Sequence, residues 1–341
     1  MLKKTTIGGQ AVFEGIMMKN VDKYAIAVRK PDQSIEVKTE EYEAVGEKIK
    51  ILKLPIIRGV FNFIESMIIG FKTLSYSTSF YEDEEDNKKP KKKKSKKDSK
   101  KENATIDEKV TDQEKNQEKN QEKEKNKEKE DGITTFFTVM LSIVIAIGIF
   151  MVLPAFLTGL LSNIIKNQLI VVILEGVLRL IIFLGYVIVI SQMSEIKRMF
   201  MYHGAEHKTI NCLEAGDALT VNNIRKHSRF HKRCGTSFIF VVIIVSIIVF
   251  MFISVDNSIL RIVYRILLVP VIAGVSYEFV RFAGKSDSKI MTILSIPGMW
   301  VQRLTTKEPD DSMIEVAIAS VEGVIDWEEY IKQLNNGELE G

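Results

Sequence analysis

The residues of this sequence that are best suited to chemistry are its four histidines and two cysteines. All of them lie in one segment between two apolar stretches: His203, His207, Cys212, His227, His231 and Cys234. Imidazole and thiolate groups are typical protein ligands of zinc, which takes four of them in a structural site and three in a catalytic one. Their concentration in a single segment therefore predicts a metal site.

The spacing of these residues predicts how they act. His203 and His207 are four residues apart and share one face of a helix, with Glu206 on the same side. The string His-Gly-Ala-Glu-His is the inverted zincin pattern, in which two histidines hold zinc and the glutamate activates water. His231 and Cys234 would complete the set. We therefore predict these two histidines, His231 and Cys234 as ligands of Zn2+ or another divalent metal, with Glu206 as general base.

Other side chains are secondary candidates for the same site: Glu14, Glu175, Arg179, Cys212, His227 and Glu278. Glu175 and Arg179 are expected to pair, because an unpaired charge within lipid is costly. Glu278 and Glu14 could be further ligands or hydrogen-bond partners of a ligating histidine. The alternative to a metal site is a set of interfacial histidines that bind phosphate groups, with Cys234 as a small buried residue.

Four apolar stretches could position this segment in a membrane, at 133–153, 169–190, 238–255 and 259–282. At a rise of 1.5 Å per residue, about 20 helical residues cross the hydrocarbon core of a bilayer. The sequence therefore predicts a mainly α, polytopic helical membrane protein with about four spans.

The basic residues predict the orientation of these spans. The 191–236 segment is rich in them, whereas the loops 154–168 and 256–258 together carry only Lys166. Because basic loops stay inside, we expect the His/Cys segment and both termini to be cytoplasmic, in a multi-pass protein of the plasma membrane. The basic residues of the segment are Lys197, Arg198, Lys208, Arg225, Lys226, Arg229, Lys232 and Arg233.

The remaining segments differ sharply in composition. Residues 1–52 predict a small soluble module with strands, and the tail 297–341 predicts a soluble region with short helices at 313–321 and 327–334. Residues 55–76 form an amphipathic helix that we expect to lie in the membrane interface, with a spanning helix as the alternative. The run 82–131 contains 17 lysines and 17 acidic residues, which predicts a disordered linker.

Four longer motifs resemble the YqhQ-like family, a bacterial membrane family of unknown function that is described as a predicted metal-dependent enzyme. They are GGQAVFEGIMM at 8–18, YHGAEHKT at 202–209, HKRCGTSF at 231–238 and PGMWVQRLTT at 297–306. The resemblance covers nearly the whole chain outside 82–131. It implies a multi-span protein with a metal site, and it supplies no substrate. Lys232 stands where the family motif has proline.

The leading functional hypothesis is a metal-dependent hydrolase that acts at the cytoplasmic face of the membrane. The second is a membrane scaffold or regulator with a structural metal or none, and the third, on weaker grounds, is a transporter. An open coordination position would favour the first, and a closed four-ligand site the second. The lipid bilayer is an expected partner, along with membrane or cytoplasmic proteins of unknown identity. The net charge of +3 gives no reason to expect nucleic acid.

Overall fold

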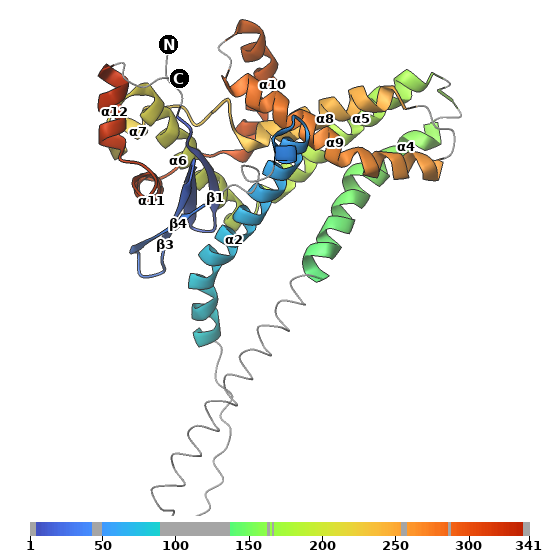
Figure 1. Ribbon diagram of the computed structural model, residues 1–341. Helices are drawn as coiled ribbons and strands as arrows, with labels where there is room; N and C mark the ends of the chain where they lie inside the picture. Colours follow the sequence, from blue (N-terminus) through green and yellow to red (C-terminus); the bar gives the residue numbers. More distant parts are fainter. Residues whose placement is uncertain are drawn as a thin grey trace, which may run out of the picture. The chain divides into compact units, whose positions relative to one another are not determined.

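The computed structural model describes residues 5–42, 50–88, 137–161, 164–165, 167–253, 258–285 and 288–336 (Figure 1). The chain separates into two compact units, one formed by Met1–Lys88 with Pro154–Gly341 and one by Lys89–Leu153. Most of the predicted linker, residues 89–131, lies outside the described residues.

The N-terminal segment forms the small β module that the sequence predicts. Its four strands pair in chain order as an antiparallel sheet: β1 (Gly8–Val12), β2 (Gly15–Asn20), β3 (Lys23–Arg29) and β4 (Ile35–Glu41). Val12 pairs with Gly15, so that Phe13 and Glu14 form a two-residue hairpin turn. Glu14 has a φ of 48°, a left-handed conformation that is uncommon for a residue other than glycine and is found mostly in turns.

Helices cover both faces of this sheet. On one face, Ile16, Met18 and Ala25 pack against α6 (Ser194–Ala215) and α11 (Asp311–Glu322). On the other, Met17 and Ile26 pack against α2 (Ile57–Lys88). Burial on both faces explains why β2 and β3 are apolar at successive positions instead of alternating. The layers are visible around the blue strands in Figure 1. The shorter helices of this part are η1 (Lys50–Lys53), α7 (Val221–Ile224) and α12 (Trp327–Asn336).

The long helix α2 has its polar stripe turned toward the protein. Arg58 donates two hydrogen bonds to the Glu278 carboxylate, and Asn62 donates one to the Tyr277 hydroxyl. Further along, Lys72 contacts Glu40 of the sheet. The helix starts near the predicted position and continues to Lys88, past the predicted end at 76. Its exposed side chains include a set of large apolar ones: Phe61, Ile64, Met67, Ile68 and Phe71.

The apolar helices α5 (Gln168–Ile190), α8 (Gly235–Met251) and α9 (Ser258–Lys285) pack together. Three described helices are long and apolar enough to cross a membrane: Phe137–Leu161, Leu169–Ile190 and Leu260–Gly284. Helix α8 is a shorter apolar helix of 17 residues, at the lower end of the length that can span a bilayer. Helix α10 (Lys289–Thr305) packs on α8 and begins before the predicted start of the tail at 297.

The first predicted span differs from its prediction at its end. The helix continues through Pro154 to Leu161, although the sequence places its end at this proline. The reason is a π-helical turn, Gly148–Val152, directly before α4 (Leu153–Leu161). Such a turn alters the backbone pairing around a residue that has no N–H to donate.

A buried ion cluster connects α5, α8 and α9. Arg179 lies 2.9 Å from the Glu175 carboxylate, as the i, i+4 spacing predicts. Arg265 of α9 lies 2.6 Å from the same oxygen, and Arg179 also donates to the Ser246 hydroxyl of α8. Both guanidinium groups lie near the Phe250 ring. The predicted pair is therefore part of a three-helix cluster.

This cluster predicts an unequal response to mutation. Glu175→Gln leaves two buried guanidinium groups without their carboxylate and should destabilise the protein by about 3–5 kcal/mol. Glu175→Gln with Arg179→Leu and Arg265→Leu removes the stranded charges and should recover much of the loss. Thermal unfolding of detergent-purified protein, followed by size-exclusion chromatography, measures both. A single variant as stable as wild type would show that the carboxylate does not hold the helices together.

Candidate metal centre

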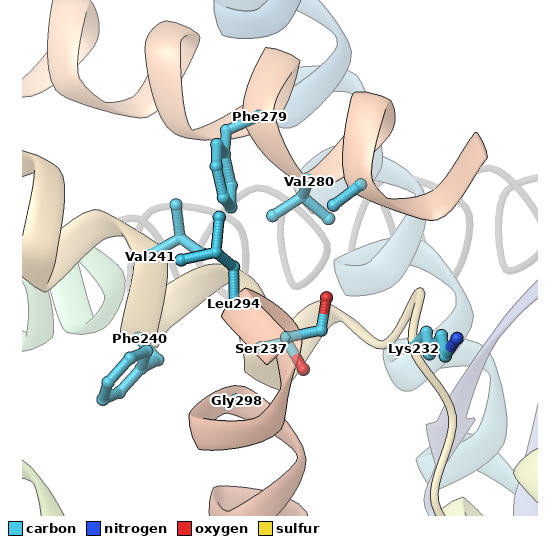
Figure 2. Close-up of a pocket in the computed structure, with 10 residues that line it drawn as sticks. Lys232, Ser237, Phe240, Val241, Phe279, Val280, Leu294 and Gly298 are labelled. Atoms are coloured by element: carbon cyan, nitrogen blue, oxygen red, sulfur yellow. The ribbon is translucent and has the colours of Figure 1, made fainter. Parts of the chain in front are cut away.

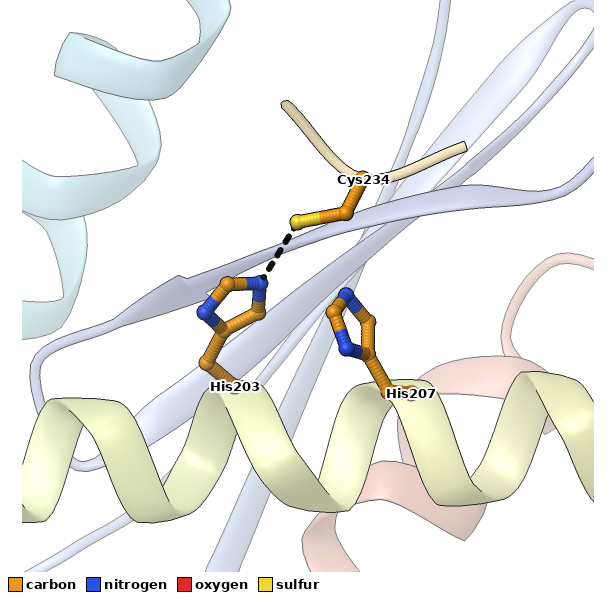
Figure 3. Close-up of side chains that lie close together, drawn as sticks. All are labelled: His203, His207 and Cys234. Carbon is orange, nitrogen blue, oxygen red and sulfur yellow. Dashed lines mark hydrogen bonds between the residues drawn. The ribbon is translucent and has the colours of Figure 1, made fainter. Parts of the chain in front are cut away.

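Helix α6 positions the first two candidate ligands. It begins only three residues after α5 ends, and it ends at Gly216, whose φ of 81° is the left-handed conformation common after a helix C-terminus. His203 and His207 lie one turn apart on this helix, with ring centroids separated by 4.3 Å. Figure 3 shows both rings projecting from the same side of α6, as their spacing predicts.

Cys234 brings the third candidate ligand from another part of the chain. It is the N-cap of α8, and its sulfur accepts a hydrogen bond from the Thr236 backbone N–H. The sulfur lies 3.2 Å from Nε2 of His203. One donor atom from each of these two residues and His207 lies within 4.8 Å of the other two. Cys234 and His207 are buried and His203 is half-buried, so the group lies mostly inside the protein.

Backbone carbonyls fix the orientation of the two rings. Nδ1 of His203 lies 2.8 Å from the Thr305 carbonyl oxygen, and Nδ1 of His207 lies 2.7 Å from that of Arg229. A carbonyl can only accept, so each Nδ1 donates its proton to it, and in a neutral ring the lone pair is then on Nε2. Burial also lowers the pKa of His207, which favours the neutral ring. Neutral imidazole with a carbonyl-bound second nitrogen is the usual form of a metal-binding histidine.

Buried polar side chains of α6 hold the loop that supplies the Arg229 carbonyl. The Lys208 ammonium donates to the Arg225 and His227 carbonyls and lies 3.0 Å from Glu308. Asn211 donates to two more carbonyls of the same loop, at Ser228 and Phe230. In the sequence, Lys208 stands out only as a basic residue of the segment, and its position one residue after His207 is the available signal for this role.

The fourth predicted ligand, His231, lies beside the group but outside it. Its ring centroid is 5.7 Å from that of His207, and its Nε2 is 3.6 Å from a carboxylate oxygen of Glu214. Glu214 also contacts Arg233. Glu214 is not among the residues predicted from the sequence, although it lies two helical turns after His207 on the same face of α6.

Glu206 occupies a buried position at the edge of this group. A Cβ atom built at Gly9 of β1 would lie 2.8 Å from its Oε1, so only glycine leaves room for the carboxylate there. Among the described residues, the Glu206 carboxylate has no hydrogen-bond partner. Burial raises its pKa to about 7, against a smaller opposing effect of His203. The carboxyl group can therefore exchange a proton near neutral pH.

The close approach of another chain segment explains why the His-Gly-Ala-Glu-His string has a glycine at position 204. A Cβ atom at this position would lie 2.0 Å from the Lys307 carbonyl oxygen. The chain after α10 thus passes directly against α6, and this approach brings the Thr305 carbonyl to His203.

The secondary candidates have partners elsewhere and do not join the three-residue group. Glu14 forms an ion pair with Arg198 and accepts a hydrogen bond from the Tyr202 hydroxyl. His227 lies 2.9 Å from Asp217. Cys212 is fully buried in the core between α6 and the sheet. Glu278, Glu175 and Arg179 take part in the interhelical contacts described above.

Comparison with known proteins gives the family. A family model described as "Protein of unknown function (DUF1385)" matches residues 54–327. The chain belongs to this family. It is also 32% identical over 335 residues to "Uncharacterized protein YqhQ" of Bacillus subtilis (strain 168), covering 96% of this chain and 94% of that protein. The resemblance seen in the sequence motifs is confirmed. No solved structure matches the chain significantly.

Cys212 is expected to be less reactive than an ordinary thiol. Burial raises the pKa of Cys212 to about 12, so only about one thiol in ten thousand is ionised near pH 8. In a Cys234→Ala variant, Cys212 should therefore stay unlabelled by a maleimide reagent, with labelling increasing as the pH rises. Intact-mass spectrometry measures the labelling, and the same variant in sodium dodecyl sulfate is the control. Full labelling of the folded variant near neutral pH would contradict this environment.

Proposed function

We propose that this chain is a multi-pass membrane protein that holds a divalent metal at one end of its membrane helices and hydrolyses a substrate there. The observation that carries the proposal is the approach of three donor atoms, from His203, His207 and Cys234, to within 4.8 Å of one another. Two imidazole nitrogens and one thiolate form a donor set that suits zinc. The carbonyl contacts of both rings support the same assignment, because they engage Nδ1 and leave the Nε2 side of each ring facing the group.

Three protein ligands leave one position of a tetrahedral zinc free, which is typical of catalytic sites. A zinc ion held there would supply a Lewis acid that polarises the scissile group. Glu206 would accept one proton from the attacking water and return it to the leaving group as the scissile bond breaks. The burial of Glu206 beside the histidines, without a hydrogen-bond partner among the described residues, supports its availability for this role.

We propose further that α5, α8, α9 and the helix Phe137–Leu161 cross the plasma membrane with the His/Cys segment in the cytoplasm. The apolar length of these helices and the buried ion cluster between three of them support the membrane location. The excess of basic residues in 191–236 supports the orientation. Cys234 caps α8, so the metal centre would lie at the boundary between membrane and cytoplasm.

A structural metal in a scaffold protein is the second candidate function. The observation that favours it is the position of His231, whose ring lies 5.7 Å from that of His207. A small rotation away from Glu214 would bring a fourth ligand to the group and close the coordination shell. Replacing the candidate ligands one at a time distinguishes an open three-ligand site from a closed four-ligand site.

Alanine replacement should identify the ligands. His203→Ala, His207→Ala and Cys234→Ala should each lower bound zinc well below one ion per chain, because each removes one of three donors. The loss in affinity should exceed the roughly 10–100-fold that an outer-shell partner contributes. His231→Ala should keep near wild-type content, since this ring lies outside the group. Elemental analysis of detergent-purified protein, prepared without chelators, measures the content.

Loss of the metal in His231→Ala as complete as in the other three variants would favour the closed structural site. Wild-type protein without metal would remove both metal-dependent functions.

Glu206→Gln should separate catalysis from metal binding. Glutamine keeps the shape of the side chain and cannot accept the proton, so the metal should remain while activity falls by roughly 10²–10⁴-fold. With the substrate unidentified, complementation of a deletion strain is the measurement, with metal content and protein level determined in parallel. Glu195→Gln, at an exposed position in the first turn of the same helix, is the matched control. Full complementation by Glu206→Gln with bound metal would contradict the catalytic role.

A further inference from the structure

A hollow between α8, α9 and α10 combines an apolar wall with one cation. Phe240 and Val241 of α8, Phe279 of α9 and Leu294 of α10 line one side, and Lys232 lies at the other. Figure 2 shows these apolar side chains gathered away from the lysine. The hollow has about 300 Å³ of empty space including the part that is open to solvent, and its enclosed part has room for about one water molecule. A long ligand would therefore lie along the open side of the hollow.

The lysine at this hollow is available to a ligand. Its ammonium group donates to the Thr292 hydroxyl of α10 at 3.2 Å, and among the described residues it has no carboxylate partner. The neighbouring arginines are different, because Arg229 lies near Glu308 and Arg233 near Glu214. A half-buried ammonium with a hydroxyl beside it is suited to an anionic oxygen such as that of a phosphate.

In the proposed membrane orientation, the hollow would lie along the part of α8 that is at the membrane interface. This helix has no charged residue from Gly235 to Met251, and Val241 lies about 9 Å along it from Gly235. Apolar faces of interfacial helices enter the boundary of headgroups and acyl chains to about 5–10 Å. Trp300 is 62% exposed on α10, which is a typical interfacial anchor.

We propose that an anionic phospholipid of the bilayer binds in this hollow. Its phosphate lies on the Lys232 ammonium and the Thr292 hydroxyl, and an acyl chain follows Phe240, Val241 and Leu294. The positive charge of Lys232 favours an anionic headgroup. The apolar wall continues along α8, which favours a ligand with an acyl chain over a soluble phosphate. The site does not depend on a bound metal, although the lysine is only two residues from Cys234.

Hydrogen bonds within the protein hold the wall of the hollow in place. Ser237 lines the hollow, and its hydroxyl accepts a hydrogen bond from the Gln302 amide, which in turn bonds the backbone of His231. The wall of the hollow is thus fixed by the residues that position the His/Cys segment. A lipid in it would rest on a rigid surface.

Native mass spectrometry of the full chain in detergent tests this site with added dioleoyl phosphatidylglycerol or dioleoyl phosphatidylcholine. Wild-type protein should retain phosphatidylglycerol in preference to phosphatidylcholine. Lys232→Gln should weaken that retention by about fivefold, the contribution of one cation at a lipid surface. Lys197→Gln is the matched control, because this lysine is exposed on α6 and should not matter. Ala283→Leu, which narrows the hollow, should also lower retention.

Several outcomes would overturn the proposal. They are equal retention of the two lipids, equal effects of the two lysine variants, and displacement of phosphatidylglycerol by inorganic phosphate alone. Size-exclusion profiles identify variants that fail to fold, in which case Lys232→Met, which keeps the length and removes the charge, takes the place of Lys232→Gln. Metal content measured on the same samples keeps this result separate from the metal proposal.

Discussion

The geometry of the His/Cys segment depends on one buried amide. The Gln302 side chain of α10 accepts a hydrogen bond from the His231 N–H and donates to the His231 carbonyl and the Ser237 hydroxyl. Its oxygen and both of its amide hydrogens are therefore used, and the side chain is fully buried. A buried amide without partners would be costly, so these three contacts hold the loop, α8 and α10 in one arrangement. Cys234 reaches the two histidines of α6 because this arrangement fixes the chain on either side of it.

The sequence predicted those features that depend on local spacing. His203 and His207 share a face of α6 because they are four residues apart, and the same rule predicted the contact between Glu175 and Arg179. Residues that act across long sequence distances could not be predicted in this way. Arg265 and Gln302 became visible only when the helices were placed together. His231 belongs to the same class, since its position relative to His207 depends on a 23-residue connection that no periodicity fixes.

The sequence of α2 predicts its polar stripe but not whether that stripe faces water or protein. The sequence predicted its polar stripe, and the contacts of Arg58 and Asn62 with α9 show that this stripe faces the protein. The apolar side is exposed instead, with Ile68 at 63% and Met67 at 59%. The amphipathic pattern of a helix identifies its polar face, but it does not say whether water or protein contacts that face. For this helix the partner of the polar side is a neighbouring helix and a sheet.

The sulfur of Cys234 has one role in the structure, as the N-cap of α8, and a second in the proposed metal site. It accepts the Thr236 N–H at the first turn of α8, and as a thiolate it would be one of the three proposed metal ligands. A metal ion bound to that thiolate would bind at the same time to the end of an apolar helix. The free energy of metal binding would then contribute to the stability of α8. In chains that fold without the ion, the first turn of α8 would be less stable. Metal supply would in this way become a condition for correct membrane assembly.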